Sequence, residues 1–273
     1  MRVLQTLTRV LAVSCVAAVV AMSAQAQEKK PFEPKVGQAG KDVIWVPTPQ
    51  ALVDKMLEVA KLTANDIHYD LGSGDGRSVI TAAKRGARAF GVEFNPDMVE
   101  LSRANAAKEG VSERATFIQG DIFATDFSKA NVITLYLLPS LNLKLRPTIL
   151  DMQPGTRIVS HSFSMGDWAA DQNVEGFDGC QYCRAYFWMV PAKVEGTWKL
   201  SDGEIRLEQK YQMLSGSVKS STATATITAG KMMGNEITFT AGGAHYSGKL
   251  NGSTIEGVMK NGTIETPFKA TKS

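Results

Sequence analysis

A short glycine-rich segment lies between an apolar run and a helical pattern, and an acid stands directly before it. The segment is Tyr69 to Arg77, with Asp70 at the end of the apolar run and glycines at 72, 74 and 76. Glycines let the backbone approach a ligand without a side-chain clash. The spacing differs from the G-x-G-x-x-G of dinucleotide sites. Asp70 would repel a pyrophosphate but not a cationic ligand such as a sulfonium, so a nicotinamide-dependent oxidoreductase is disfavoured.

Two more acids follow the next two apolar runs. Glu93 lies about 20 residues after the glycine turn, and Asp121 ends the run that starts at Ala115. An acid at the position of Glu93 can accept hydrogen bonds from both hydroxyls of a ribose. Asp121 can face the edge of an adenine, with Phe94 and Ile122 packing on the base. Together the three acids and the turn predict a site for an adenosine-containing ligand.

Strand and helix patterns alternate around these residues. Apolar runs at 67–71, 89–93, 115–121, 131–136 and 157–161 predict strands, and helices are predicted after Thr48 as N-cap, around 78–85, from 95 to about 108 and from about 140 to 152. This alternation predicts an α/β fold with a mostly parallel sheet. Its ligand belongs at the carboxyl ends of the strands, which is where the three acids lie.

The composition changes near Gly196. From 197 to 273 the sequence shows period-two segments, such as 204–208 and 236–240, separated by turns such as Asn251-Gly252 and Asn261-Gly262. This is typical of antiparallel hairpins. We expect about seven short strands in a small all-β domain, a barrel or a sandwich, with no catalytic residue of its own.

The N-terminal segment has the pattern of a cleavable export signal. Arg2 and Arg9 precede an uncharged apolar run at 10–22, and Ala24-Gln25-Ala26 follows it. We therefore predict a signal peptide at 1–26, a linker at 27–42, an α/β domain at 43–196 and the β domain at 197–273. The mature chain would be exported, to the periplasm. Retention of the segment as a membrane anchor is the alternative.

Charge and cysteine content exclude some classes of partner. Removal of residues 1–26 leaves 28 basic and 27 acidic residues, so no nucleic-acid partner is expected. Cys180 and Cys183 are spaced C-x2-C, and outside the cytoplasm the default for such a pair is a disulfide or a redox couple. Zinc would need two more ligands, and the three histidines show no metal-type spacing, so no metal site is predicted.

At this point the chain resembles the class I S-adenosylmethionine-dependent methyltransferases, whose first motif is matched by Asp70 to Gly76. Its further motifs resemble the mitochondrial-type protein lysine methyltransferases, which act on membrane-embedded ATP synthase and carrier proteins, and their bacterial relatives. The resemblance covers about 45–198 and is carried by Val46 to Pro49, Tyr69 to Arg77, Gly91 to Asn95, Gly120 to Phe123, Leu135 to Pro139 and Pro154 to Ser160.

The resemblance implies a Rossmann-like domain that binds S-adenosyl-L-methionine and N-methylates a lysine. The substrate implied is a protein, and a protein close to a membrane is one possibility. Tyr136, Pro139 and Asn142 are expected to line the acceptor site. The loop lacks the Asn-Pro-Pro-Tyr signature that suits planar amide or base nitrogens. The cofactor residues implied are Thr48, Asp70, Gly72, Ser73, Gly74, Glu93, Phe94, Asp121, Ile122 and Tyr136.

Several alternatives stay open at this level. An exported methyltransferase fold could be a non-catalytic binding protein that holds an adenosine-like ligand or a partner. Tyr136 could simply fill the end of the sheet. His161, beside Ser160 and Ser162, could take a proton from the acceptor, although a hydrogen-bonded structural histidine is the simpler interpretation.

Overall fold

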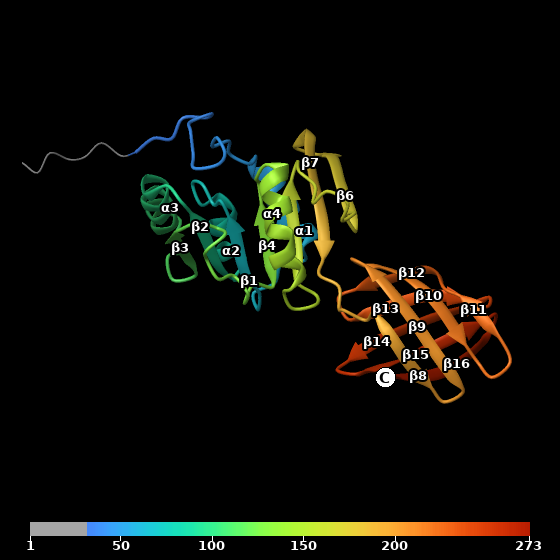
Figure 1. Cartoon of the computed structure of the whole chain (residues 1–273). Coiled ribbons are helices and arrows are strands. Elements are labelled where there is room, and N and C mark those ends of the chain that lie inside the picture. Colours follow the sequence, from blue (N-terminus) through green and yellow to red (C-terminus); the bar gives the residue numbers. More distant parts are fainter. Residues whose placement is uncertain (1–31) are drawn as a thin grey trace, which may run out of the picture. The chain divides into compact units, whose positions relative to one another are not determined.

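The computed structural model describes residues 32–273 (Figure 1). The predicted signal peptide and the first residues of the predicted linker lie outside this range. Within it, none of the helices combines the length and the apolar character needed to span a bilayer.

The first sheet carries the chemistry-bearing segments. It has seven strands in the order β3-β2-β1-β4-β5-β7-β6. The neighbours from β3 to β5 pair in parallel, whereas β7 is antiparallel to both β5 and β6. A mostly parallel sheet is therefore confirmed, and the β6-β7 hairpin is an addition to the five predicted strands. The bounds are β1 Ile67–Leu71, β2 Arg88–Glu93, β3 Ala115–Gln119, β4 Val132–Leu135, β5 Arg157–His161, β6 Gln172–Phe177 and β7 Cys180–Met189.

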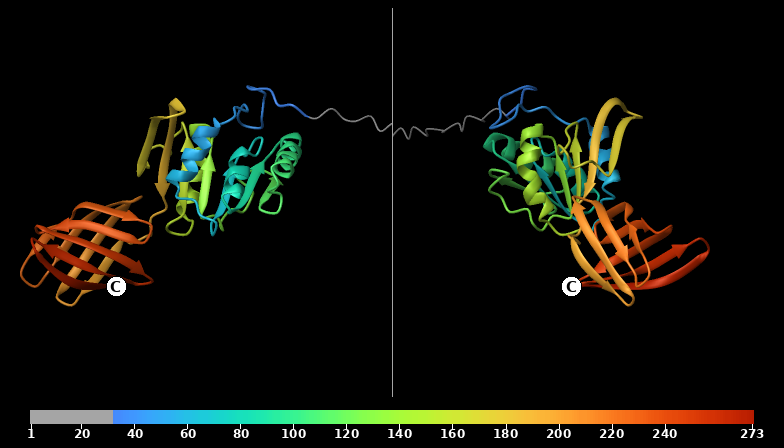
Figure 2. Two further views of the ribbon diagram at one scale, coloured as in Figure 1. Left: turned by 180° about the vertical axis from the view of Figure 1, so that it is seen from behind. Right: turned by 45° about the vertical axis from the view of Figure 1, so that its right-hand side comes forward.

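Four helices cover this sheet. They are α1 Gln50–Val59, α2 Arg77–Lys84, α3 Pro96–Lys108 and α4 Pro139–Leu150. The first three lie on one face and α4 lies on the other (Figures 1 and 2). Asn95 caps α3 as its sequence suggests, accepting hydrogen bonds from the backbone N–H groups of Asp97 and Met98.

The prediction that Thr48 caps α1 is wrong. The N-cap residue is Pro49, and no side chain caps this helix. The Thr48 hydroxyl instead lies 3.1 Å from Nδ1 of His161. A tertiary partner at the end of β5 has replaced the local capping bond.

The second sheet is entirely antiparallel and has nine strands rather than the seven expected. Its order is β11-β10-β12-β13-β14-β15-β16-β8-β9, and β9 also pairs with β10, which closes eight of the strands into a barrel-like ring. Inward side chains such as Trp198, Ile237 and Phe239 form its core. The bounds are β8 Gly196–Leu200, β9 Gly203–Lys210, β10 Met213–Lys219, β11 Thr224–Thr226, β12 Thr228–Met233, β13 Glu236–Ala241, β14 Ala244–Asn251, β15 Thr254–Asn261 and β16 Ile264–Lys272.

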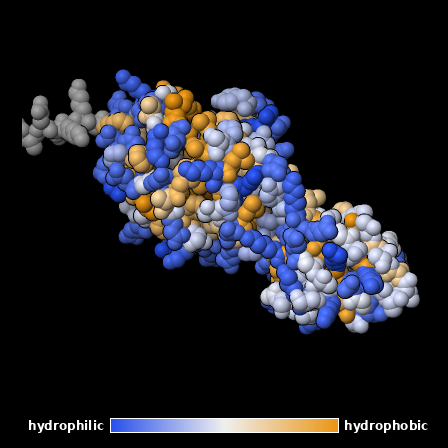
Figure 3. Space-filling model, viewed as in Figure 1, coloured by the Kyte–Doolittle hydropathy of each residue, from blue (hydrophilic) through white to orange (hydrophobic). Residues whose placement is uncertain are grey.

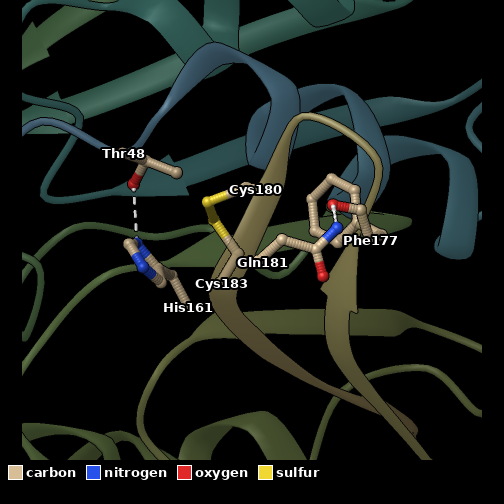
Figure 4. Close-up of a disulfide and its surroundings, with 6 residues drawn as sticks. All are labelled: Thr48, His161, Phe177, Cys180, Gln181 and Cys183. Carbon is tan, nitrogen blue, oxygen red and sulfur yellow. Dashed lines mark hydrogen bonds between the residues drawn. A yellow bond between two sulfur atoms is a disulfide. The ribbon is translucent and has the colours of Figure 1, made fainter.

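A disulfide joins Cys180 and Cys183 at the start of β7. Both cysteines are buried and belong to a hydrophobic cluster that includes Leu52 and Met56 of α1 and Val159 of β5. The crosslinked tip of the hairpin is therefore packed against the first helix, close to Thr48 and His161 (Figure 4).

Candidate functional site

A cavity of about 620 Å³ opens at the carboxyl ends of β1, β2 and β4. All ten residues that the sequence assigned to the cofactor line it, which are Thr48, Asp70, Gly72, Ser73, Gly74, Glu93, Phe94, Asp121, Ile122 and Tyr136. Parallel strands bring these residues together, because the carboxyl ends of such strands lie at one edge of the sheet. The fold thus places acidic and aromatic side chains in one cavity.

The turn between β1 and α2 has little space for side chains. Gly74 and Gly76 have φ values of +55° and +83°, in the left-handed region that favours glycine. A Cβ on Gly74 would lie 2.7 Å from Nε1 of Trp45, and one on Gly76 would lie 2.8 Å from the ring of Phe117. Side chains at these two positions would therefore clash with Trp45 and Phe117, and the turn can pack this closely only with glycine.

Glu93 is held in place through both of its carboxylate oxygens. Oε2 accepts a hydrogen bond from the Gly74 N–H at 3.0 Å, and Oε1 accepts one from the Asn95 N–H at 2.9 Å. Each oxygen keeps a further lone pair for a ligand. A fixed carboxylate with two free acceptor positions suits the adjacent hydroxyls of a ribose.

Asp121 is paired with a cation that the sequence did not single out. Its Oδ1 accepts the Phe123 N–H at 2.9 Å, and its Oδ2 lies 2.7 Å from Nζ of Lys41. The hydrogen bond from Lys41 is the main reason that the pKa of Asp121 is lowered. The Lys41 ammonium also lies 5.2 Å from the ring centroid of Phe94.

Lys41 belongs to a turn that folds back over the cavity. The backbone of Gly37 donates to the Trp45 carbonyl at 2.8 Å, and Trp45 donates to the Gln38 carbonyl at 2.9 Å. Residues 38–48 border the cavity, so part of the predicted linker belongs to the site. No local pattern identifies this role, because the partner of Lys41 lies 80 residues further along the chain.

Asp70 is a buried carboxyl in a chain of hydrogen bonds. The Thr134 hydroxyl donates to its Oδ1 at 2.7 Å, and Nε2 of His68 lies 2.9 Å from the same hydroxyl oxygen. Since that hydroxyl has a single proton, His68 donates from Nε2. Burial raises the pKa of Asp70 to about 7, although hydrogen bonds from Thr134 and Ser78 oppose the shift. Burial also lowers the pKa of His68 to about 3, so this ring is neutral.

The part of the lining that follows β4 is apolar and aromatic. Tyr136, Leu138 and Phe163 line the cavity there, together with Thr48. Pro139 and Asn142 do not border the cavity. Pro139 begins α4, and the Asn142 amide is buried and donates to Ser160 Oγ and to the carbonyls of Phe163 and Ser164, each at 3.2 Å. A direct contact of Pro139 or Asn142 with the acceptor stays a prediction.

Comparisons with known proteins agree with this geometry. Residues 70–172 match the family model described as the ANTKMT methyltransferase domain. The chain is 41% identical over 151 residues to a protein-lysine N-methyltransferase of Saccharolobus islandicus (strain REY15A), which covers 54% of this chain and 94% of that protein. The chain belongs to this family of methyltransferases.

Two other relatives show how far the likeness reaches. A lysine N-methyltransferase of Homo sapiens, named for the ATP synthase c-subunit, is 31% identical over 136 residues, which covers 49% of this chain and 58% of that protein. A crystal structure described as an RNA methyltransferase from Salinibacter ruber in complex with S-adenosyl-L-homocysteine has 49% identity and a TM-score of 0.52. It covers 55% of this chain and 96% of its own. The chain thus spans just over half the length of the human relative.

The family and the solved relative establish the enzyme class and the cofactor. The chain is an S-adenosylmethionine-dependent methyltransferase, and the alternative of a non-catalytic binding protein has no support. When bound, the cofactor supplies an activated methyl group on a sulfonium. The residues present fit it, since the turn from Gly72 to Gly74 lines the cavity, Glu93 offers acceptors for the ribose and Asp121 offers one for the adenine.

Replacing Glu93 by alanine is expected to weaken cofactor binding by about 1.5–3 kcal/mol, because hydrogen bonds to a charged group are lost. Calorimetric titration of S-adenosyl-L-homocysteine into both proteins measures this. Glu100→Ala is the matched control, since Glu100 is an exposed partner of Arg103 on α3 and should leave the affinity unchanged. Equal affinities in the Glu93 variant and the wild type would contradict the assignment.

Replacing Asp70 by asparagine is expected to stabilise the free protein at alkaline pH. The raised pKa means that the folded state holds a proton that the unfolded state releases above pH 3.8, so this group's contribution to the unfolding free energy falls as pH rises from about 4 to 7. Urea titrations at pH 5 and pH 8 should show a smaller pH dependence in Asp70→Asn and a gain of a few kcal/mol at pH 8. An unchanged pH dependence would mean that Asp70 titrates normally.

Proposed function

We propose that this methyltransferase transfers the methyl group to the side-chain nitrogen of a lysine in a protein substrate. The observation that carries the proposal is the acceptor end of the cavity, where aromatic and aliphatic side chains such as Tyr136, Leu138 and Phe163 surround the position after β4. Such a passage suits the aliphatic stem of a lysine. The printed names of the archaeal and human relatives, both lysine N-methyltransferases, support the same acceptor.

Methyl transfer needs a neutral lysine amine, a site without water, and alignment of the nitrogen with the methyl carbon and the sulfur. An apolar passage removes water from the lysine ammonium and so lowers its pKa, which favours loss of a proton before attack. With the cofactor bound, the nitrogen lone pair would form a bond to the methyl carbon as the carbon–sulfur bond breaks, and the electrons of that bond would return to sulfur. Residues such as Tyr136 and Thr48 would contribute by orientation and by exclusion of water.

RNA is the second candidate acceptor, because the Salinibacter ruber relative is described as an RNA methyltransferase. Two observations favour lysine. The segment from Leu135 to Pro139 has no planar amide or second proline to hold a base, and the chain after Ala26 is nearly neutral, whereas nucleic-acid sites carry an excess of cations.

Several of the residues that line the cavity are apolar and exposed, which favours an acceptor lysine with apolar neighbours. Ile44, Leu138 and Phe94 line the cavity and remain exposed, with Ile44 60% and Leu138 43% accessible. Apolar atoms gather on the upper part of the α/β region in Figure 3. We propose that the acceptor lysine is flanked by apolar side chains, as in a protein segment close to a membrane surface.

The test supplies the labelled methyl donor to three acceptors, namely a lysine peptide with leucine flanks, the same peptide with serine flanks, and RNA. Label is expected in the peptides, with a preference of about tenfold or more for leucine flanks, since burial of one leucine is worth that much. Tyr136→Ala should lower transfer strongly, whereas Tyr182→Ala, at a side chain 84% exposed, should not. Label in RNA alone would overturn the proposal.

We also propose that the mature chain is exported. The buried disulfide between Cys180 and Cys183 supports an oxidising compartment, because such bonds are rare where thiols are kept reduced. Fractionation followed by N-terminal sequencing should find a chain that begins at Gln27 outside the cytoplasm, and Ala26→Trp should block this cleavage. An uncleaved, cytoplasmic chain with free thiols would contradict it.

A further inference from the structure

We propose that His161 is a positioning residue for methyl transfer, which holds the side chains of Thr48 and Tyr136 at the acceptor end of the cavity. The inference rests on the proposed lysine acceptor. Thr48 and Tyr136 both line the cavity, whereas His161 lies behind them and does not. A single ring therefore supports two parts of the wall that come from distant segments of the chain.

The contacts of His161 are specific on both sides. Its Nδ1 lies 3.1 Å from the Thr48 hydroxyl oxygen, across 113 residues of sequence. Its ring stacks on the Tyr136 ring, with centroids 3.8 Å apart and planes inclined by 29°. Figure 4 shows the imidazole pointing at the Thr48 hydroxyl. The Nδ1 atom thus holds the Thr48 hydroxyl, while the face of the imidazole holds the Tyr136 ring.

The backbone under His161 is itself held firmly. His161 is the last residue of β5 and pairs with Ala185 of β7. The next residue, Ser162, has a φ of +61° and donates its N–H to the Arg184 carbonyl at 2.8 Å. The Asn142 amide holds the residues on either side, Ser160 and Phe163. The position of the ring is therefore set by two strands and a helix, as a positioning role requires.

The charge of the ring suits its place. Burial lowers the pKa of His161 to about 4, so the ring is neutral under physiological conditions. A neutral ring adds no positive charge beside the point where a cationic donor and an amine meet. The same property makes it a poor general base at neutral pH, because an efficient base has a pKa near the working pH. The contacts with Thr48 and Tyr136, together with the neutral ring, therefore favour positioning over proton transfer from the acceptor.

Two substitutions separate the two contacts. His161→Asn keeps a hydrogen-bonding group near the position of Nδ1 but removes the stacking ring, whereas His161→Phe keeps a ring and removes the hydrogen-bonding nitrogen. Each is expected to lower kcat for the lysine peptide by about 10-fold to 100-fold, the effect of a misplacement of about 1 Å, and to weaken the affinity for S-adenosyl-L-homocysteine by a smaller factor. His245→Ala, at an exposed position of β14, is the control and should change neither quantity.

A double-mutant cycle tests the link to Thr48. Thr48→Val should cost little more in the His161→Phe background, where the hydrogen bond is already lost, but should retain its cost in the His161→Asn background. Additive losses in both backgrounds, or a kcat that stays at the wild-type value in both His161 variants, would overturn the proposal.

A second readout does not depend on methyl transfer. The chain has three histidines, so their imidazole signals can be assigned by NMR. The His161 signals should shift in Thr48→Val, through the lost hydrogen bond, and in Tyr136→Ala, through the lost ring current. Unmoved signals would refute the positioning role of His161 even in an active enzyme. Absence of lysine methylation by the wild type, with both shifts present, would reject the proposed acceptor and retain the contacts of His161.

Discussion

Close packing at the turn after β1 constrains the whole site. Gly74 and Gly76 adopt left-handed conformations, and a single added carbon would meet Trp45 or Phe117. The turn can therefore pack closely between the sheet, α2 and the folded-back segment, with Gly72, Ser73 and Gly74 lining the cavity. Glu93 depends on the same turn, because its carboxylate is oriented by the Gly74 N–H.

The cavity lining combines acids with apolar and aromatic side chains. Its acids are Asp70, Glu93 and Asp121, which suit a ligand with hydroxyls, an amine and a positive sulfur. Its aromatic side chains include Tyr136, on which a neutral histidine is stacked. A cationic donor would be bound beside the acids, and an amine would lose water beside the apolar side chains.

The cavity lining around Thr48 and Tyr136 is supported by strands that contribute no side chain to the cavity. The β6-β7 hairpin extends the sheet beside β5, and its disulfide packs on α1 and β5. Strand β5 ends at His161, and α1 begins two residues after Thr48. The additional antiparallel strands therefore bear on the site through packing, although none of their side chains lines the cavity.

Local patterns were enough to predict the strand-helix alternation, the glycine turn, the three acids and the family, because each rests on neighbouring residues or on a fixed spacing. The number of β strands after Gly196, the N-cap of α1 and the sites of Lys41 and His161 were decided only by the tertiary structure. Thr48 was expected to cap its own helix, yet its hydroxyl pairs with a residue 113 positions away. Lys41 reaches Asp121 across 80 residues. Such contacts depend on which chain segments the fold brings together, and no short-range pattern encodes that.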